Sequence, residues 1–466
     1  TGNSHDQYYF RRSVDMVAGS VAPPRLDLTN EALLASHLHA LWLSETGADL
    51  HSRIPQLLDL EAPGMPLTQD LAKALREPQA LSRATDRAFA LVAPLIEHLR
   101  QTSWWHEDWP KAIIAGAPDE FDKACARWRE LYQAALDDQA EQNRIVLDGS
   151  VRPGDRKAAE ARRREAEGQL RLLRNEDTEL THSDFYTYRY FASEGFLPGY
   201  SFPRLPLAAY IPGVRAAVAN QATGEYLQRP RFLAISEFGP GAIIYHEGAR
   251  YEIKRIQVPM SSGGIGTVET QDAYRCESCG YHHVRRPGLD VCENCEAPLS
   301  TPQYGLMRMQ TVYGRRRERI SSDEEERRRA GFELQISYRF SQHGPRMGRA
   351  DASTRDGAGE LLAVSYGDTA TVRVTNIGRR RRKHPADLGY WLDTVKGNWL
   401  SERDAVDATP LDDSLDDAAD APSKHKVIPY VEDTRNILVL RMDSLVSPEI
   451  STTLRYALER GIEAEF

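Results

Sequence analysis

The sequence predicts an α+β protein of several domains, in which a helical region is followed by a mixed, β-rich region that binds a metal. Three observations support this prediction. With 466 residues, the chain is long enough for about two to four domains. Residues 61–180 repeat apolar side chains at helical spacing. Beyond residue 184 the chain is rich in aromatic residues, prolines and short alternating segments, which are typical of strands.

Residues 1–60 are predicted to connect a preceding domain to the helical region, and they contain one clear helix. This helix is expected within "NEALLASHLHALWLSET", where leucines and a tryptophan repeat at helical spacing. Asn30 or Thr29 is a suitable N-cap, and Gly47 is a typical residue just beyond a helix end. The preceding "VAPPRLDL" should be extended, because its two prolines exclude a helix there.

Residues 61–183 are predicted to form a helical accessory region. Three segments carry an apolar stripe, and each begins with Thr, Ser or Asp as a candidate cap: "TQDLAKALRE", "SRATDRAFALVAPLIEHLRQ" and "DEFDKACARWRELYQAALDDQAEQNRIV". Cys125 lies on the last stripe and should be a small core residue.

A fourth helical segment, "DRKAAEARRREAEGQLRLLRNE", is highly charged. Its leucines should mark the end that contacts the rest of the protein: Leu170, Leu172 and Leu173. Two interpretations stay open for the charged face. It is either a solvated surface with ion pairs between residues four apart, or a surface that contacts DNA.

Residues 184–466 are predicted to form a β-rich, zinc-binding domain. The aromatic block 185–202 should be non-repetitive core, although such rings also stack on bases. "RFLAISEFGPGAIIYHEGARYEIKRIQVP" predicts short strands of a small barrel or antiparallel sheet. "NILVLRM", residues 436–442, should be a buried strand. Residues 403–424 hold seven aspartates and should form a mobile acidic loop.

The two ends of the sequence suggest that more chain precedes and follows it. There is no initiator methionine, and the opening "TGNSHDQYYFRR" does not resemble a signal peptide. The closing "SPEISTTLRYALERGIEAEF" predicts a helix with an apolar face and no terminating residue after it. Such a face is expected to have a partner, so we interpret both ends as cut.

The strongest motif is a set of four cysteines in two C-x-x-C pairs, which are separated by twelve residues. Each tight pair supplies two thiolates, and a loop of this length brings the second pair opposite the first, as in a tetrahedral zinc site. A disulfide pair and an iron–sulfur cluster are the alternatives. His282 and His283 could replace a ligand, but four cysteines already complete a closed, structural zinc site without an open catalytic position. The predicted ligands are Cys276, Cys279, Cys292 and Cys295.

Three groups of basic residues are candidates for contacts with a nucleic acid, because such runs follow a phosphate backbone and release counterions. Solvated surface is the alternative for each. The segment "GRRRERISSDEEERRR" also holds acidic residues, which suggests an exposed helix with internal ion pairs. The candidates are Arg285 and Arg286 in the cysteine loop, Arg315, Arg316 and Arg317, and Arg379, Arg380, Arg381, Arg382 and Lys383.

The composition and the missing motifs exclude several classes of protein. The net charge is −9, so any surface for nucleic acid must be local. No apolar run is long enough for a membrane span. Cysteines in C-x-x-C pairs suit a reducing compartment, and we expect a cytoplasmic protein. The sequence contains no G-x-x-x-x-G-K-[ST], G-x-S-x-G or H-E-x-x-H motif. We therefore expect no complete active site within these residues.

Several segments resemble the C-terminal part of large superfamily 2 DNA helicases of the DEAD/DEAH type. "HDQYYFRR", "PPRLDLTNE" and "HLHALWL" are similar to the segment that follows the last helicase motif. "SDFYTYRYFASEGFLPGYSFPRLPL", the four cysteines, "VTNIGRRRRK" and "GYWLDTVKGNW" resemble a domain of unknown function, also described as an MrfA-type zinc-binding domain. The likeness covers nearly the whole chain and is weak over residues 61–180.

The resemblance implies an ATP-driven helicase or translocase on DNA, of the kind that bacteria use in DNA repair or in anti-phage systems such as Druantia and DISARM. Residues 1–60 would then follow the second RecA-like lobe. ATP and Mg²⁺ would bind upstream domains, and other defence subunits are expected partners. Two alternatives stay open. One is a non-enzymatic adaptor that docks on a separate helicase or nuclease, and the other is a zinc enzyme that modifies nucleic acids.

Overall fold

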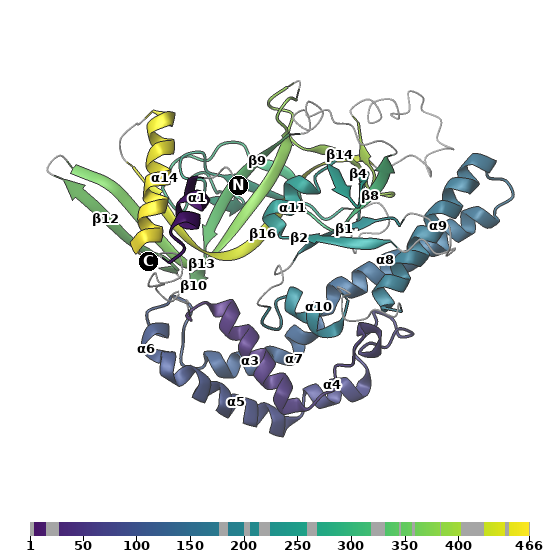
Figure 1. Cartoon of the computed structure of the whole chain (residues 1–466), viewed down its shortest axis with the longest axis horizontal. Coiled ribbons are helices and arrows are strands. Elements are labelled where there is room, and N and C mark those ends of the chain that lie inside the picture. The colour runs from purple at the N-terminus through teal and green to yellow at the C-terminus, as the bar shows by residue number, and fades with distance from the viewer. Residues whose placement is uncertain are drawn as a thin grey trace.

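The computed structural model describes residues 4–14, 28–176, 185–199, 206–213, 224–258, 268–317, 331–343, 346–356, 359–382, 384–401, 424–442 and 447–465. Figure 1 shows a helical part that runs from α3 to α10 and a β-rich part that follows it along the chain. The predicted α+β architecture, with helices first and strands second, is therefore confirmed.

The helical part is built around one apolar core. It follows a short helix, α1 (Ser4–Arg11). Its elements are α3 (Glu31–Thr46), η1 (Ile54–Gln56), α4 (Gln69–Leu75), α5 (Pro78–Val92), η2 (Ala93–Leu95), α6 (Ile96–Leu99), α7 (Trp109–Ala124), α8 (Ala126–Leu147), α9 (Pro153–Arg174) and α10 (Thr187–Ser193). The largest fully buried side chains of this core include Trp42 of α3, Phe121 of α7 and Trp128 of α8.

Local capping chemistry explains the ends of α3. The side chain of Asn30 accepts a hydrogen bond from the backbone N–H of Leu33 at 3.0 Å, which satisfies one of the free donors at the helix start. Gly47 follows the last turn at φ 62°, a conformation that is easy for glycine. Both predicted ends are confirmed.

The predicted starts of the next long helices are wrong. Helix α5 begins at Pro78, and the carboxylate of Glu77 accepts from the N–H groups of Gln79 and Ala80. Helix α7 begins at Trp109, ten residues before the predicted cap, because Pro110 suits the first turn. A break at Cys125 then separates α7 from α8. Cys125 is completely buried, as predicted.

The charged helix α9 pairs with α8 to form a long hairpin, which extends to the right in Figure 1. Leu170 and Leu173 are buried at its C-terminal end, as predicted. Of the aromatic block, Phe185, Tyr190 and Phe196 lie in the same apolar cluster as the helices. The described rings of this block are therefore mainly core.

A five-stranded sheet begins the β-rich part. Its strands, in sheet order, are β2 (Glu225–Arg229), β1 (Leu207–Ile211), β8 (Val312–Arg317), β4 (Ala249–Ile256) and β3 (Ile243–His246). All neighbours are antiparallel except β1 and β8, which are parallel. A short helix, α11 (Arg231–Glu237), covers part of the core. The prediction of a strand at this position is wrong, because "RFLAISE" packs its apolar side against the core as two helical turns.

A second, nine-stranded sheet holds the cysteine motif. Its main order is β12 (Ala350–Asp356), β13 (Gly359–Arg379), β16 (Lys424–Arg441), β7 (Gln303–Arg308), β5 (Gln271–Arg275) and β6 (His282–Val284). Strand β9 (Phe332–Phe340) pairs with β13, and β14 (Tyr390–Asp393) pairs with β16 and with β15 (Trp399–Leu400). A separate two-stranded ladder joins β10 (Gln342–His343) and β11 (Arg346–Met347).

The long strands β13 and β16 pair with each other and with most of the other strands of this sheet. β16 pairs first with β14, then in parallel with β7, and finally with β13 over residues 430–441. The ladder with β13 is irregular between Gly367 and Ala370. A Cβ on Gly367 would lie 2.6 Å from the ring of Phe340, so the close approach of β9 requires glycine there.

Two predictions for this end of the chain have different outcomes. Residues 436–441 form the last part of strand β16, as predicted. The prediction that this segment is buried is wrong, since Leu438 is 42% exposed. The closing helix is confirmed as α14 (Pro448–Glu465). Its apolar side chains Ile450 and Tyr456 are exposed. Several predicted segments lie outside the described residues: the acidic stretch 403–423, residues 21–27 of the "VAPPRLDL" connector, residues 318–329 of the second basic segment, and Lys383.

A charged junction joins the helical hairpin to the first sheet. Arg255 of β4 forms ion pairs with Asp138 of α8 at 3.0 Å and Glu165 of α9 at 3.9 Å. Its guanidinium lies 4.0 Å from the ring centroid of Tyr313 in β8. All three charged side chains are at most about one quarter exposed, since their exposed fractions are 21%, 24% and 26%. The two carboxylates therefore depend on Arg255 for compensation.

Arg255→Met is expected to lower the free energy of unfolding by about 2–3 kcal/mol, because it leaves two carboxylates without their cation in a poorly solvated place. Urea denaturation at neutral pH measures the loss. Arg229→Met is the control, since Arg229 and its partner Glu237 are 43% and 49% exposed and should contribute less than about 1 kcal/mol. Equal effects of the two substitutions would contradict the role of the junction.

Candidate metal centre

The two C-x-x-C pairs fold into two loops with the same backbone hydrogen bonds. In the first, the N–H of Cys276 donates to Tyr281 O at 2.8 Å, and the N–H of Gly280 donates to Cys276 O at 2.9 Å. In the second, Cys292 donates to Ala297 O at 2.8 Å, and Glu296 donates to Cys292 O at 2.9 Å. The loops therefore present their sulfurs in equivalent ways, and each supplies half of one site.

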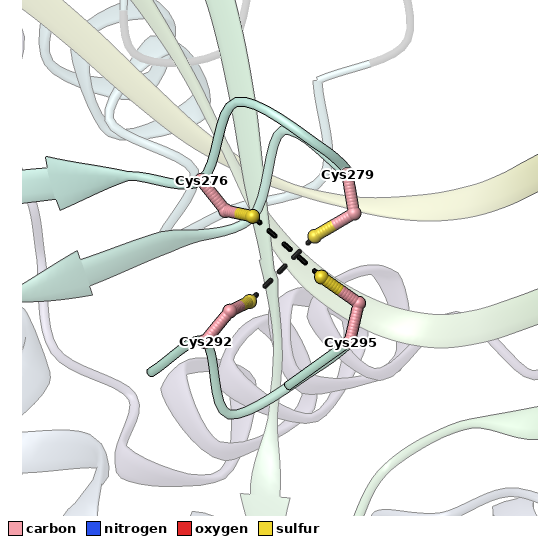
Figure 2. A group of neighbouring side chains, drawn as sticks. All are labelled: Cys276, Cys279, Cys292 and Cys295. Atoms are coloured by element: carbon pink, nitrogen blue, oxygen red, sulfur yellow. Dashed lines mark hydrogen bonds between the residues drawn. The ribbon is translucent and has the colours of Figure 1, made fainter. Parts of the chain in front are cut away.

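The four sulfurs converge on one point. All of them lie within 4.8 Å of one another. Figure 2 shows the two loops facing each other, with Sγ of Cys276 3.6 Å from Cys295 and Sγ of Cys279 3.7 Å from Cys292. A Zn–S bond of about 2.3 Å gives a tetrahedron whose edges are about 3.75 Å long. These distances therefore suit a tetrahedral metal, and they are far longer than the roughly 2.05 Å of a disulfide bond.

The surroundings of the thiols favour a compensating cation. Burial raises the pKa of Cys279 and of Cys292, so neither ionises readily by itself. Burial acts on Cys276 in the same direction, but backbone N–H groups of Cys279 and Ser278 and the sulfur of Cys295 outweigh it and lower its pKa. A divalent metal would supply the charge that stabilises the thiolates together.

A layer of polar side chains fixes the two loops around the sulfurs. The amide of Asn294 lies 3.6 Å from Cys279 Sγ and donates to Tyr338 Oη at 3.3 Å, while Arg349 donates to its carbonyl oxygen. Nε2 of His283 lies 3.4 Å from Cys292 Sγ. Tyr338 and Arg349 come from distant parts of the chain, so the sequence motif did not indicate their contacts.

The cysteine loops also pack on the neighbouring strands. Tyr281 is fully buried and its ring contacts Tyr338 of β9 edge to face, at a centroid distance of 5.6 Å. The backbone N–H of Tyr338 donates to Gly280 O at 3.3 Å. An apolar cluster joins Cys276, Cys292, Tyr338 and Phe340. The cysteine cluster is therefore part of the core between the β5–β6 hairpin and β9.

Neither histidine is placed as a ligand. The group with ligand atoms close enough to share an ion holds the four cysteines and no histidine. Burial lowers the pKa of His282 to about 3, so it is neutral near pH 7. Burial also lowers the pKa of His283, against the opposing effect of Glu293. Within the described ranges, the other group of this kind is Glu225, His246 and Glu247, at a partly exposed turn.

The arginines of the cysteine loop are held by acidic side chains. Arg285 forms an ion pair with Asp272 at 3.0 Å and lies over the ring of Tyr304. Arg286 pairs with Glu293, which also contacts His283. Both arginines thus brace the hairpin, and their charge is already compensated.

The second basic group lies on strand β8, so the prediction of a helix is wrong for residues 315–317. These residues are extended because β8 forms ladder hydrogen bonds with β1 on one side and with β4 on the other. Arg317 forms an ion pair with Glu252 of β4. Arg315 and Arg316 are exposed, and among the described residues neither has an ion-pair partner.

The third basic group divides into supporting and exposed side chains. Arg379 donates to Pro240 O at 3.2 Å, and Arg382 pairs with Glu333 at 2.6 Å while its side chain is only 14% exposed. Arg380 and Arg381 are exposed. The Nε of Arg380 donates to Phe332 O at 3.2 Å, which leaves its terminal nitrogens for other acceptors. The four described arginines of this group therefore do not form one surface of free charge.

No protein-family model, no curated protein and no solved structure matches this chain. In the part of the chain that the structure describes, no helix combines the length and apolarity needed to cross a bilayer.

The equivalent positions Gly280 and Glu296 give a test of the loop geometry. Both residues have positive φ, 76° for Gly280 and 60° for Glu296, and a side chain is strained in this conformation. Glu296→Gly is therefore expected to stabilise the metal-loaded protein by about 0.5 kcal/mol, and Gly280→Ala to destabilise it by about 1 kcal/mol. Thermal unfolding of the three proteins measures both changes. The same sign for both would contradict the equivalence of the loops.

Proposed function

We propose that this chain is the zinc-stabilised, DNA-binding accessory part of an ATP-dependent DNA helicase or translocase that acts in bacterial DNA repair or anti-phage defence. The observation that carries the metal part of the proposal is the convergence of four sulfurs at distances suited to a tetrahedral ion. The DNA part rests on the resemblance described above and on the exposed arginines.

The metal in this proposal is a structural zinc ion. Four cysteines would fill all four positions of a tetrahedral site, so no position is left for a water molecule or a substrate. In this proposal no chemical step takes place at the zinc. Its role is to fix the β5–β6 hairpin against β9 and so to hold the surrounding strands in one arrangement.

In this proposal, other domains bind and hydrolyse ATP. The sequence has no Walker A motif, and such a motif is needed to cradle the phosphates of ATP in a P-loop enzyme. RecA-like lobes would supply hydrolysis, and this chain would contact the DNA on which they move. The cytoplasm is the expected location.

The arginines best suited to phosphate contact are exposed ones without an acidic partner. Among the candidates these are Arg315, Arg316, Arg380 and Arg381. Arg379 is also exposed and has no acidic partner, but it is set aside because a terminal nitrogen already donates to Pro240 O. An exposed guanidinium retains its donors for a phosphate, whereas Arg285, Arg286, Arg317 and Arg382 already pair with carboxylates. This selection narrows the predicted DNA surface to four of the ten candidates.

The purified protein is expected to contain one zinc ion per chain, which elemental analysis measures. Cys276→Ser/Cys295→Ser should lose the metal, and hydrogen exchange should then rise across residues 271–300 and β9, because the closed site holds these segments together. Cys125→Ala is the matched control, since this cysteine is buried far along the chain in the helical core. Retention of zinc by the serine variant would contradict the assignment.

DNA binding tests the proposed function directly. Arg315→Ala/Arg316→Ala/Arg380→Ala/Arg381→Ala is expected to weaken binding to duplex DNA and to reduce the slope of log K against log salt by about one per arginine that contacts a phosphate. Fluorescence anisotropy at several salt concentrations measures both.

The control for this experiment is Arg285→Ala/Arg286→Ala/Arg317→Ala, which removes charges that are already paired and should keep the slope of the wild type. If the fourfold variant binds with an unchanged slope, these arginines are not the DNA surface. If the unaltered chain does not bind DNA at all, the proposed function is wrong.

A further inference from the structure

A cavity of about 760 Å³ lies between the charged helix α9 and the end of strand β1. Gln139 of α8, Tyr210 of β1 and a set of α9 arginines line it. It shares no residue with the metal centre or with the arginines assigned above to DNA. Its volume falls within the range of about 300–1,000 Å³ that is usual for small-ligand sites.

The spacing of the arginines explains why they meet in one place. Arg164, Arg171 and Arg174 are seven and ten residues apart, so they project from one face of α9. Arg162 also lines the cavity, although it is about two and a half turns from Arg171 and so starts from the opposite side of the helix. Helix α9 therefore places three arginines of one face, and the side chain of a fourth, around a concave surface.

The acidic side chains of the cavity form their ion pairs with residues outside it, although Glu165 also attracts Arg162 at longer range. Glu165 pairs with Arg255 of β4 at 3.9 Å, and Glu167 lies 3.5 Å from Arg163. Arg174 is engaged by Tyr132, to which it donates at 2.6 Å, and by Glu176 at 3.6 Å.

The remaining three arginines of the cavity are not neutralised. Across the described ranges, no carboxylate lies within ion-pair distance of Arg162, Arg164 or Arg171. The cavity therefore carries an excess of positive charge.

One buried donor in the cavity also lacks an acceptor. The Nε of Arg171 is inaccessible to solvent, and among the described residues no oxygen accepts its hydrogen bond. Leaving a charged donor unsatisfied costs free energy, and such atoms in a native structure call for an explanation. Because this Nε is inaccessible even in the empty cavity, an anion in the cavity would meet Arg171 through its terminal nitrogens.

We propose that this cavity binds the phosphate group of a nucleotide or of a nucleic-acid backbone. Planar guanidinium groups match phosphate oxygens with paired hydrogen bonds, and a doubly charged anion with several acceptor oxygens uses three unpaired arginines better than a single carboxylate does. This inference adds a site on the helical hairpin, and it stands even if the zinc domain does not bind DNA. Of the two interpretations of the charged helix, it favours a binding surface over a merely solvated one.

The test compares the zinc-loaded full chain with variants of α9. Isothermal titration with inorganic phosphate, pyrophosphate and ATP without Mg²⁺ measures binding of free phosphates, and anisotropy with a fluorescein-labelled single-stranded oligonucleotide measures binding of a backbone. Arg164→Gln/Arg171→Gln is expected to weaken binding tenfold or more. Arg152→Gln/Lys157→Gln removes the same charge from exposed positions of the same helix, outside the cavity, and should change binding less than twofold.

Two further readouts separate binding from folding. Arg171→Lys keeps the positive charge but loses the planar guanidinium that can donate two parallel hydrogen bonds to a phosphate. This variant should therefore fold normally and bind with intermediate affinity. The compound that binds should also raise the melting temperature of the wild type more than that of Arg164→Gln/Arg171→Gln.

The outcomes are separable from those for the proposed function. Binding of free phosphate compounds supports a nucleotide site, and binding of the oligonucleotide alone supports a backbone site. Equal binding by the cavity variant and its control, or no binding of any probe, would overturn the inference. Loss of DNA binding in the variant of Arg315, Arg316, Arg380 and Arg381, with no effect of the cavity variant, would leave the proposed function intact and remove only this site.

Discussion

Four cysteine sulfurs that lie within 4.8 Å of one another repel each other once they ionise, and a cation between them would remove this repulsion. The arrangement of much of the β-rich part depends on this one interaction. Each loop has little structure of its own beyond a few backbone hydrogen bonds. The strands that it follows, β5 and β6, are short. Because Tyr281 and Gly280 of the first loop contact Tyr338 in β9, the loops also position β9 against β13. The cysteine cluster thus links a local hairpin to the ladder between β9 and β13.

The contact between the helical part and the β-rich part relies on different chemistry. Arg255 joins β4 to both helices of the α8–α9 hairpin, and the aromatic ring of Tyr313 covers its guanidinium. A second contact joins the loop after α6 to the irregular segment of β13, where Asp368 accepts from the N–H of Ser103 at 2.6 Å. The Ser103–Asp368 contact is exposed, whereas the charged groups around Arg255 have limited solvent access and tolerate little displacement, so the Arg255 contacts contribute more to fixing the arrangement of the two parts.

Sequence reasoning succeeded where a short segment determines its own structure. The cap at Asn30, the glycine after α3 and the spacing of the four cysteines are of this kind, and all are present in the structure. It failed where contacts with residues distant in the sequence determine the local structure. The segment of α11 has strand-like composition, yet it forms a helix that packs on the core beneath it.

The arginine clusters show the same limit. Their charge is plain in the sequence, but whether a given arginine is free depends on carboxylates far away in the chain. Arg382 is paired with Glu333 and Arg317 with Glu252. The contacts of Asn294 with Cys279 and Arg349 likewise require the folded β sheet. The sequence pattern therefore predicted that the four cysteines come together, but it did not predict the side chains that support them.

The path of strand β16 has a consequence for the order in which the protein forms during synthesis. β7 and β13 emerge from the ribosome well before residues 424–441, which pair with both of them. The cysteine loops, in contrast, are separated by only twelve residues and can close around a metal as soon as they are made. The second sheet must wait for its central strand, since long-range pairing is slow and leaves edges exposed. An early metal-bound hairpin would thus be a preformed surface on which the late strand completes the sheet.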